Sequence, residues 1–104
     1  MHDNTDKFMA MIGFAKRAGK IVYGYDNLVS ARGIRLLAVS DTASDNLTRD
    51  MRSLADKKSV PLVTAPALET TVGNNVKALG MTDANMAKAA LAYAREDGND
   101  YKAD

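Results

Sequence analysis

The stretch Ile34-Arg35-Leu36-Leu37-Ala38-Val39-Ser40 decides the fold class of this chain. Its centre, residues 36–39, is an unbroken apolar run, and such a run is typical of a strand that is buried on both faces. A strand of this kind requires a sheet with helices on both sides. The segments before and after it must therefore supply those helices.

Two helical segments and a short β-prone run precede this strand. Residues 5–17 carry apolar side chains at helical spacing. Ile21-Val22-Tyr23 then predicts a short strand. The chain turns at Gly24, and a second helix follows to about Arg32, with Asp26 as its expected N-terminal cap.

The segments that follow the central strand alternate in the same way. A helix is predicted first, capped by a residue of the loop 41–44 and running through Ala55, and a strand follows at Val60–Val63. The next segments predict a loop or short helix at Ala65–Val72, a helix at Gly73–Leu79 and a strand near Leu79–Thr82. Thr82 or Asp83 then caps a last helix, which runs to Arg95. This alternation predicts a three-layer α/β/α sandwich, with a four-stranded mixed sheet and helices on both faces.

Length and charge describe one small, mildly basic domain. The 104 residues fit a single domain over 1–104, with an ordered core at about 5–95. The net charge is +1, but residues 96–104 hold four acids and one base. The rest of the chain has 13 bases and 9 acids, a net charge of +4. We therefore expect a basic body followed by an acidic tail at 96–104.

The chain lacks the residues that several classes of function require. The chain has no cysteine, and its only histidine is His2, which excludes thiolate metal sites and a histidine-based catalytic triad. No stretch reaches the roughly 20 apolar residues of a membrane-spanning helix, and the polar start of the chain does not predict a signal peptide. We expect a cytoplasmic protein that is not an enzyme and has no catalytic residue, metal or cofactor.

The segment most informative about function begins with Lys16-Arg17-Ala18-Gly19-Lys20, which places three cations within five residues. It leads through a strand to Gly24 and a helix start, where unpaired backbone N–H groups attract phosphate. The side chain of Tyr25 is suited to stacking on a base, and those of Asp26 and Asn27 to hydrogen bonding with base edges. These features predict contact with an irregular RNA.

The same residues also have a purely structural interpretation. Lys16 and Arg17 suit the C-terminal end of any helix. Gly24 can be an ordinary turn residue, Asp26 a helix cap, and Tyr25 half-buried. Residue types alone leave both interpretations open.

Three stretches carry a resemblance to a known family: FMAMIGFAKRAGKIVYGYDNLVSA at 8–31, RLLAVSDTASDNLTRDM at 35–51, and VPLVTAPALETTVGNNV at 60–76. They resemble the kink-turn RNA-binding ribosomal protein superfamily, the ribosomal protein L-seven-Ae and L-thirty-e type, and within it the small bacterial YlxQ-like members. The order of the elements is similar over about residues 5–95.

The resemblance implies a non-catalytic, ribosomal-protein-like protein that binds structured, kink-turn-like RNA. Association with the ribosome or with translation, ribosomal RNA as a partner, and a monomeric state are implied as well. The family's RNA-reading motif falls on Gly24, Asp26, Asn27 and Leu28. Its apolar loop, which covers protruding bases, falls on Val72-Gly73.

Three positions depart from the family's pattern. Asp26 stands where strong binders have Asn or Lys, Asn27 where Glu or Gln is usual, and Ser30 where Lys is common. An ionised Asp cannot donate to a base and repels phosphate. Two other hypotheses therefore stand beside RNA binding: a protein-interaction adaptor on the same fold, and an enzyme accessory resembling the substrate-binding domain of some RNA methyltransferases.

Overall fold

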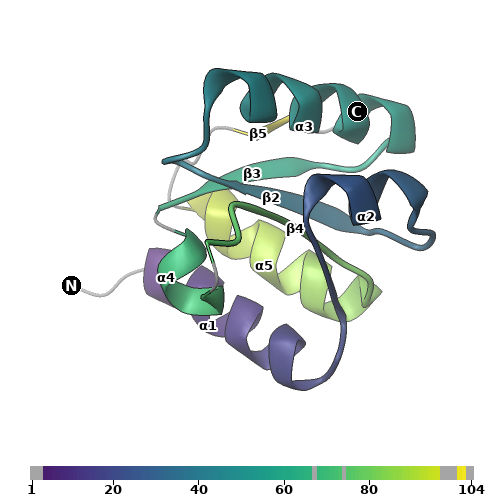
Figure 1. Cartoon of the computed structure of the whole chain (residues 1–104). Helices are drawn as coiled ribbons and strands as arrows, with labels where there is room; N and C mark the ends of the chain where they lie inside the picture. Colours follow the sequence, from purple (N-terminus) through teal and green to yellow (C-terminus); the bar gives the residue numbers. More distant parts are fainter. Residues whose placement is uncertain (1–3, 67, 74, 97–100, 103–104) are drawn as a thin grey trace.

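A mixed β-sheet forms the middle layer of the molecule (Figure 1). The computed structural model describes residues 4–66, 68–73, 75–96 and 101–102. Over these residues the elements are, in chain order, α1 (Asn4–Arg17), β1 (Ile21–Tyr23), α2 (Tyr25–Ser30), β2 (Leu36–Ser40), α3 (Asp45–Lys58), β3 (Leu62–Ala65), α4 (Leu68–Val72), β4 (Ala78–Met81), α5 (Ala84–Glu96) and β5 (Tyr101–Lys102).

The strand order is β1-β4-β2-β3-β5. Among the strands of the described residues, only β2 and β3 run parallel, while β4 pairs antiparallel with both β1 and β2. The three-layer α/β/α architecture with a mixed sheet is thus confirmed, and all four predicted strands are present. A fifth strand, β5, extends the sheet by pairing antiparallel with β3.

Strand β2 is buried on both faces, as its apolar run predicts. Leu36 and Ala38 belong to a core shared with α1, α4 and α5. Leu37 and Val39 belong to a second core shared with α2 and α3. Because successive side chains of a strand point to opposite faces, this one segment joins the two cores, and Figure 1 shows the two helix layers on either side of the sheet.

The prediction of a helix over Gly73–Leu79 is wrong. Gly73 and Asn75 have φ angles of 80° and 58°, in the left-handed region that an α-helix cannot use. The N–H of Val76 donates to the carbonyl oxygen of Gly73, which closes a turn. The chain then enters β4, where Leu79 pairs with β1 on one side and β2 on the other.

Two predicted helix caps have different outcomes. Asp83 caps α5, since its Oδ1 accepts from the N–H of Met86 at 2.9 Å. Asp26 does not cap α2, because the N-cap position is Gly24 and no side chain bonds there. The helix cap thus lies two residues earlier than predicted, and Asp26 lies inside the first helical turn.

Part of the predicted acidic tail lies outside the described residues. Asp97, Asp100 and Asp104 belong to that part. Within the described residues, no helix has the length and apolar character that spanning a membrane requires.

Candidate nucleic-acid interface

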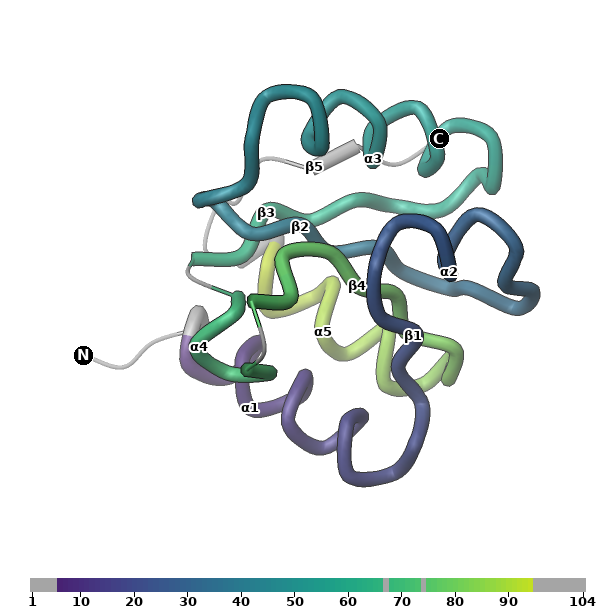
Figure 2. The backbone as a smooth tube through the Cα atoms, in the orientation of Figure 1, coloured from purple at the N-terminus to yellow at the C-terminus, as the bar shows by residue number. Residues whose placement is uncertain are grey.

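The turn at Gly24 lies at the end of β1, next to the beginning of β4. The N–H of Gly24 donates to the carbonyl oxygen of Ala78 at 3.0 Å, and the chain then passes into α2 (Figure 2). Gly24 has a φ of 87° and a ψ of 145°, a combination that glycine alone adopts readily. A Cβ placed on it would meet no atom within 4 Å, so its outer side is open.

The residues after Gly24 form the first turn of α2. Amide groups in the first turn of a helix have no acceptor within the helix, and no side chain caps this one. Asp26 and Asn27 are exposed, while Tyr25 is half-buried. The first turn thus offers backbone donors and two polar side chains at one corner of the molecule.

Asn27 is partly committed to the fold. Its Nδ2 donates to the carbonyl oxygen of Tyr23 at 2.9 Å, which ties α2 to the end of β1. The hydroxyl of Ser30 donates to the backbone carbonyl oxygen of Asn27 at 3.4 Å. Asn27 therefore fixes the shape of the corner with one amide hydrogen, and no described residue bonds to its Oδ1 or to its second amide hydrogen.

Two apolar residues predicted at the interface lie beneath it. The side chain of Leu28 is completely buried, and that of Val72 is 5% exposed. Neither can stack on a base. They can only support the surface from below, Leu28 under α2 and Val72 under the end of α4.

The predicted cations do not all surround Gly24. The carbonyl oxygen of Lys20 accepts from the N–H of Thr82, at the end of β1 opposite to the Gly24–Ala78 bond. Lys20 and Gly24 are four residue steps apart along an extended chain, so their backbones are separated by about 13 Å. Arg17, the last residue of α1, lies near the end of β1 that Lys20 precedes, and its guanidinium group lies over the ring of Phe14, 5.0 Å from the ring centroid. A polyanion would have to run along β1 to contact both ends.

Lys16 joins the two regions that the sequence singled out. Its Nζ donates to the carbonyl oxygen of Val72 at 3.2 Å, across 56 positions of sequence. Gly73 is the next residue after Val72, and the turn that it forms with Val76 leads into β4. The carbonyl oxygen of Ala78, the first residue of β4, accepts a hydrogen bond from the N–H of Gly24. The corner at Gly24 and the turn at Gly73 thus lie at the same edge of the sheet.

A polar cluster at this edge was not predicted. The hydroxyls of Ser40 and Thr42 donate to Oε1 and Oε2 of Glu69 at 2.6 and 2.7 Å. The Nζ of Lys77 donates to the carbonyl oxygen of Thr42 at 3.4 Å. The only sequence signal for the cluster is that Ser40 and Ala65 end neighbouring parallel strands, where polar groups gather in α/β folds.

Glu69 stays ionised over the whole physiological pH range. The Ser40 hydroxyl, then the Thr42 hydroxyl and the residue's own backbone N–H, lower the pKa of Glu69 from 4.5 to about 2, with a smaller contribution from the charge of Lys77. Partial burial opposes this shift. Glu69 therefore adds a fixed negative charge to this edge, and Lys77 next to it supplies a compensating positive charge.

Comparisons with known proteins show the fold alone. No family model matches this chain, and no curated protein matches it. Among solved structures, the chain is similar to a protein with unknown function from Bacillus halodurans C, with a TM-score of 0.73 and 17% sequence identity. The similarity covers 86% of this chain and 97% of that one.

Proposed function

We propose that this protein is a non-catalytic, cytoplasmic RNA-binding protein that recognises structured, sharply bent RNA and acts with the ribosome or in translation. The observation that carries the proposal is the hydrogen bond from the N–H of Gly24 to Ala78. It joins the Gly24 corner to the first residue of β4, the strand that the turn at Gly73 leads into, and this supports a common surface for the two segments predicted to contact RNA.

The chemistry of this edge suits a folded polyanion. Backbone donors at the start of α2 are typical phosphate ligands, and the absence of a side chain at Gly24 allows a sugar–phosphate backbone to come close. Lys16 and Lys77 lie at the edge itself. Arg17 and Lys20, at the other end of β1, extend the positive surface along the strand.

The acids at the edge limit its affinity for RNA. Asp26 is exposed at the corner, and Glu69 is ionised beside Lys77. Each repels phosphate and so offsets one cation. We therefore expect RNA binding that is weaker and less dependent on salt than that of a strongly basic ribosomal protein.

The experiment compares a kink-turn RNA with a straight duplex of the same base composition, using fluorescence anisotropy at several salt concentrations. We expect the protein to prefer the kink-turn RNA. The double variant Arg17→Glu/Lys20→Glu should lower the affinity at least about tenfold and reduce the salt slope by about 2 units.

The matched control is Arg52→Glu/Lys88→Glu, which changes the net charge by the same amount on the exposed faces of α3 and α5. This control should retain the preference for the kink-turn RNA. Equal affinities for the two double variants would reject the proposed surface.

A protein-interaction adaptor is the second candidate. The observation that favours it is Phe14, which is 55% exposed on α1. Capture of partners after nuclease treatment separates the two functions, because partners held through RNA are lost. Partners that survive nuclease but are lost on Phe14→Ala would favour the adaptor.

A further inference from the structure

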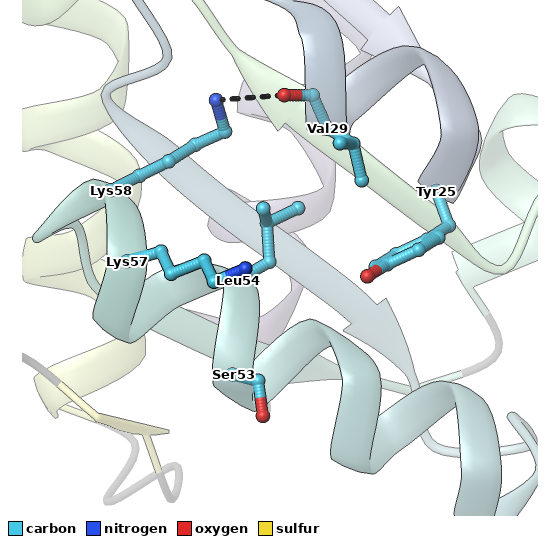
Figure 3. A pocket seen from close by; sticks show the side chains of 6 residues that line it. All are labelled: Tyr25, Val29, Ser53, Leu54, Lys57 and Lys58. Atoms are coloured by element: carbon cyan, nitrogen blue, oxygen red, sulfur yellow. Dashed lines mark hydrogen bonds between the residues drawn. The ribbon is translucent and has the colours of Figure 1, made fainter.

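A pocket of about 340 Å³ opens between α2 and α3 (Figure 3). Tyr25 and Val29 contribute from α2, four residues apart and therefore on one face of that helix. The residues contributed by α3 are Ser53, Leu54, Lys57 and Lys58. The volume is at the lower end of the range for small-molecule sites and suits a ligand the size of a mononucleotide.

Three of the residues that line this pocket are apolar or aromatic: Tyr25, Val29 and Leu54. Leu54 is almost completely buried and forms part of the core beneath the pocket. Val29 is 48% exposed, so much of its apolar surface is open to a ligand. Tyr25 is half-buried and packs on the same core. A flat ring entering the pocket would cover Val29 and stack on Tyr25.

The two lysines of the pocket have different roles. The Nζ of Lys58 donates to the carbonyl oxygens of Ala31 at 2.9 Å and Val29 at 3.5 Å, and so joins the end of α3 to the end of α2. Lys57 is exposed, and no described residue forms a hydrogen bond or ion pair with its ammonium group. In Figure 3 the side chain of Tyr25 points from α2 toward α3, and that of Lys57 runs across α3 toward Leu54.

We propose that this pocket binds a nucleoside monophosphate group, with the base against Tyr25, Val29 and Leu54 and the phosphate on Lys57. The residues that line it include two cations and no acid, so an anion meets no repulsion from the lining. The group has two sources, a free nucleotide or an unpaired nucleotide of a bound RNA. The second source rests on the proposed function, in which Gly24, the residue before Tyr25, contacts the RNA.

The first arm of the test uses AMP and UMP as probes in ¹H–¹⁵N NMR titrations of the full chain. We expect shifts of the amide signals of residues 25–30 and 53–58 at millimolar nucleotide. Adenosine and inorganic phosphate alone should bind at least about tenfold more weakly, because each makes half of the contacts. No shifts in these two segments would overturn the proposal.

Lys57→Glu tests the phosphate contact at an exposed position, where folding is not at risk. It should weaken AMP binding at least about tenfold, whereas Arg52→Glu, on the same helix but outside the pocket, should leave it unchanged. Tyr25→Leu should remove the stacking contact, and a thermal melt checks its fold. Equal AMP binding by Lys57→Glu and Arg52→Glu would also overturn the proposal.

The second arm measures kink-turn RNA binding by the same variants. If Lys57→Glu weakens RNA binding more than Arg52→Glu does, the nucleotide belongs to the RNA. If the two variants bind RNA equally while AMP binding depends on Lys57, the pocket serves a free nucleotide. Should the wild-type chain bind no RNA at all, the proposed function fails, and the AMP arm still decides the pocket.

Discussion

The hydroxyl of Ser40 donates a hydrogen bond of 2.6 Å to Oε1 of Glu69, and this bond fixes the start of α4 against the end of β2. Ser40 is 2% exposed, so its hydroxyl needs a partner inside the protein. Because Lys16 binds the other end of α4 through Val72, both ends of this five-residue helix are held by side chains from distant segments. The position of the turn at Gly73 depends on these two attachments.

Glu69→Gln should destabilise the protein at neutral pH and lose that effect in acid. The folded-state pKa of Glu69, about 2, lies below its ordinary value of 4.5. The ionised carboxylate therefore stabilises the fold fully above about pH 4.5, and the contribution is lost as the pH falls toward 2. Thermal unfolding of both proteins from pH 7 to pH 2.5 should show the difference in Tm shrinking over that window.

The variant Ser40→Ala provides the control for this mechanism. It removes the largest cause of the shift, so the pKa of Glu69 should rise, as measured by carboxyl ¹³C NMR. A Glu69 pKa that is the same in Ser40→Ala and the wild type would contradict the assignment.

Gly80→Ala should destabilise the fold by about 1–3 kcal/mol, as overpacked cores do. A Cβ at position 80 would lie 2.7 Å from Cδ2 of Leu28, 3.0 Å from Cδ1 of Ile34 and 3.2 Å from Cδ2 of Leu37. All three side chains are buried in the core that β2 shares with α2 and α3. Urea denaturation measures the free energy of unfolding.

Gly13→Ala is the matched control for the Gly80 substitution. Gly13 lies in α1, and the nearest atom to a Cβ there is Nη1 of Arg17, at 3.7 Å. Alanine should stabilise this helix by about 0.5–1 kcal/mol. Similar effects of both substitutions would show that close packing around Gly80 is not what requires glycine.

Gly24→Ala should lower both stability and RNA affinity. The φ of 87° is strained for any residue with a Cβ, at a cost of about 1–3 kcal/mol. Relief of that strain would move the first turn of α2. Gly33→Ala carries similar strain, since its φ is 75°, but lies outside the proposed surface. Anisotropy with kink-turn RNA should separate them, and an equal loss of affinity in both would count against the Gly24 corner.

Asp26→Lys should strengthen RNA binding. It removes an exposed negative charge at the corner and adds a cation. One new phosphate contact should steepen the salt dependence of log K by about 0.9 units. The comparison variant is Asp50→Lys, which makes the same charge change on α3. If RNA affinity increases equally in both variants, the increase reflects net charge and not a contact at position 26.

Much of the fold follows from local patterns. The strand at Ile21–Tyr23 is observed with the predicted bounds, and the apolar run at 36–39 is buried on both faces as expected. The failure at Gly73–Leu79 arose because Asn75 takes a left-handed conformation and Ala78–Leu79 pairs with two strands. Pairing with distant strands outweighs the weak helical propensity of such a short segment.

The candidate site was only partly predictable. Gly24 was singled out because it marks a turn after a run of cations, and Gly73 only because the family resemblance places the apolar loop at Val72-Gly73. Lys77 and Glu69 were missed because nothing local distinguishes them from ordinary surface charges. The contrast between Lys57 and Lys58, one exposed and one bound to backbone carbonyls, likewise depends on the packing of α2 against α3.

Local patterns were enough to predict the layers of this protein, because the burial of a strand or helix face depends on the spacing of apolar side chains over a few residues. The tertiary structure alone decided the strand order. Insertion of β4 between β1 and β2 puts Ala78 beside Gly24 and leaves Lys20 at the opposite end of β1. Hydrogen bonds between segments far apart in the sequence select that order, and no short stretch of sequence contains them.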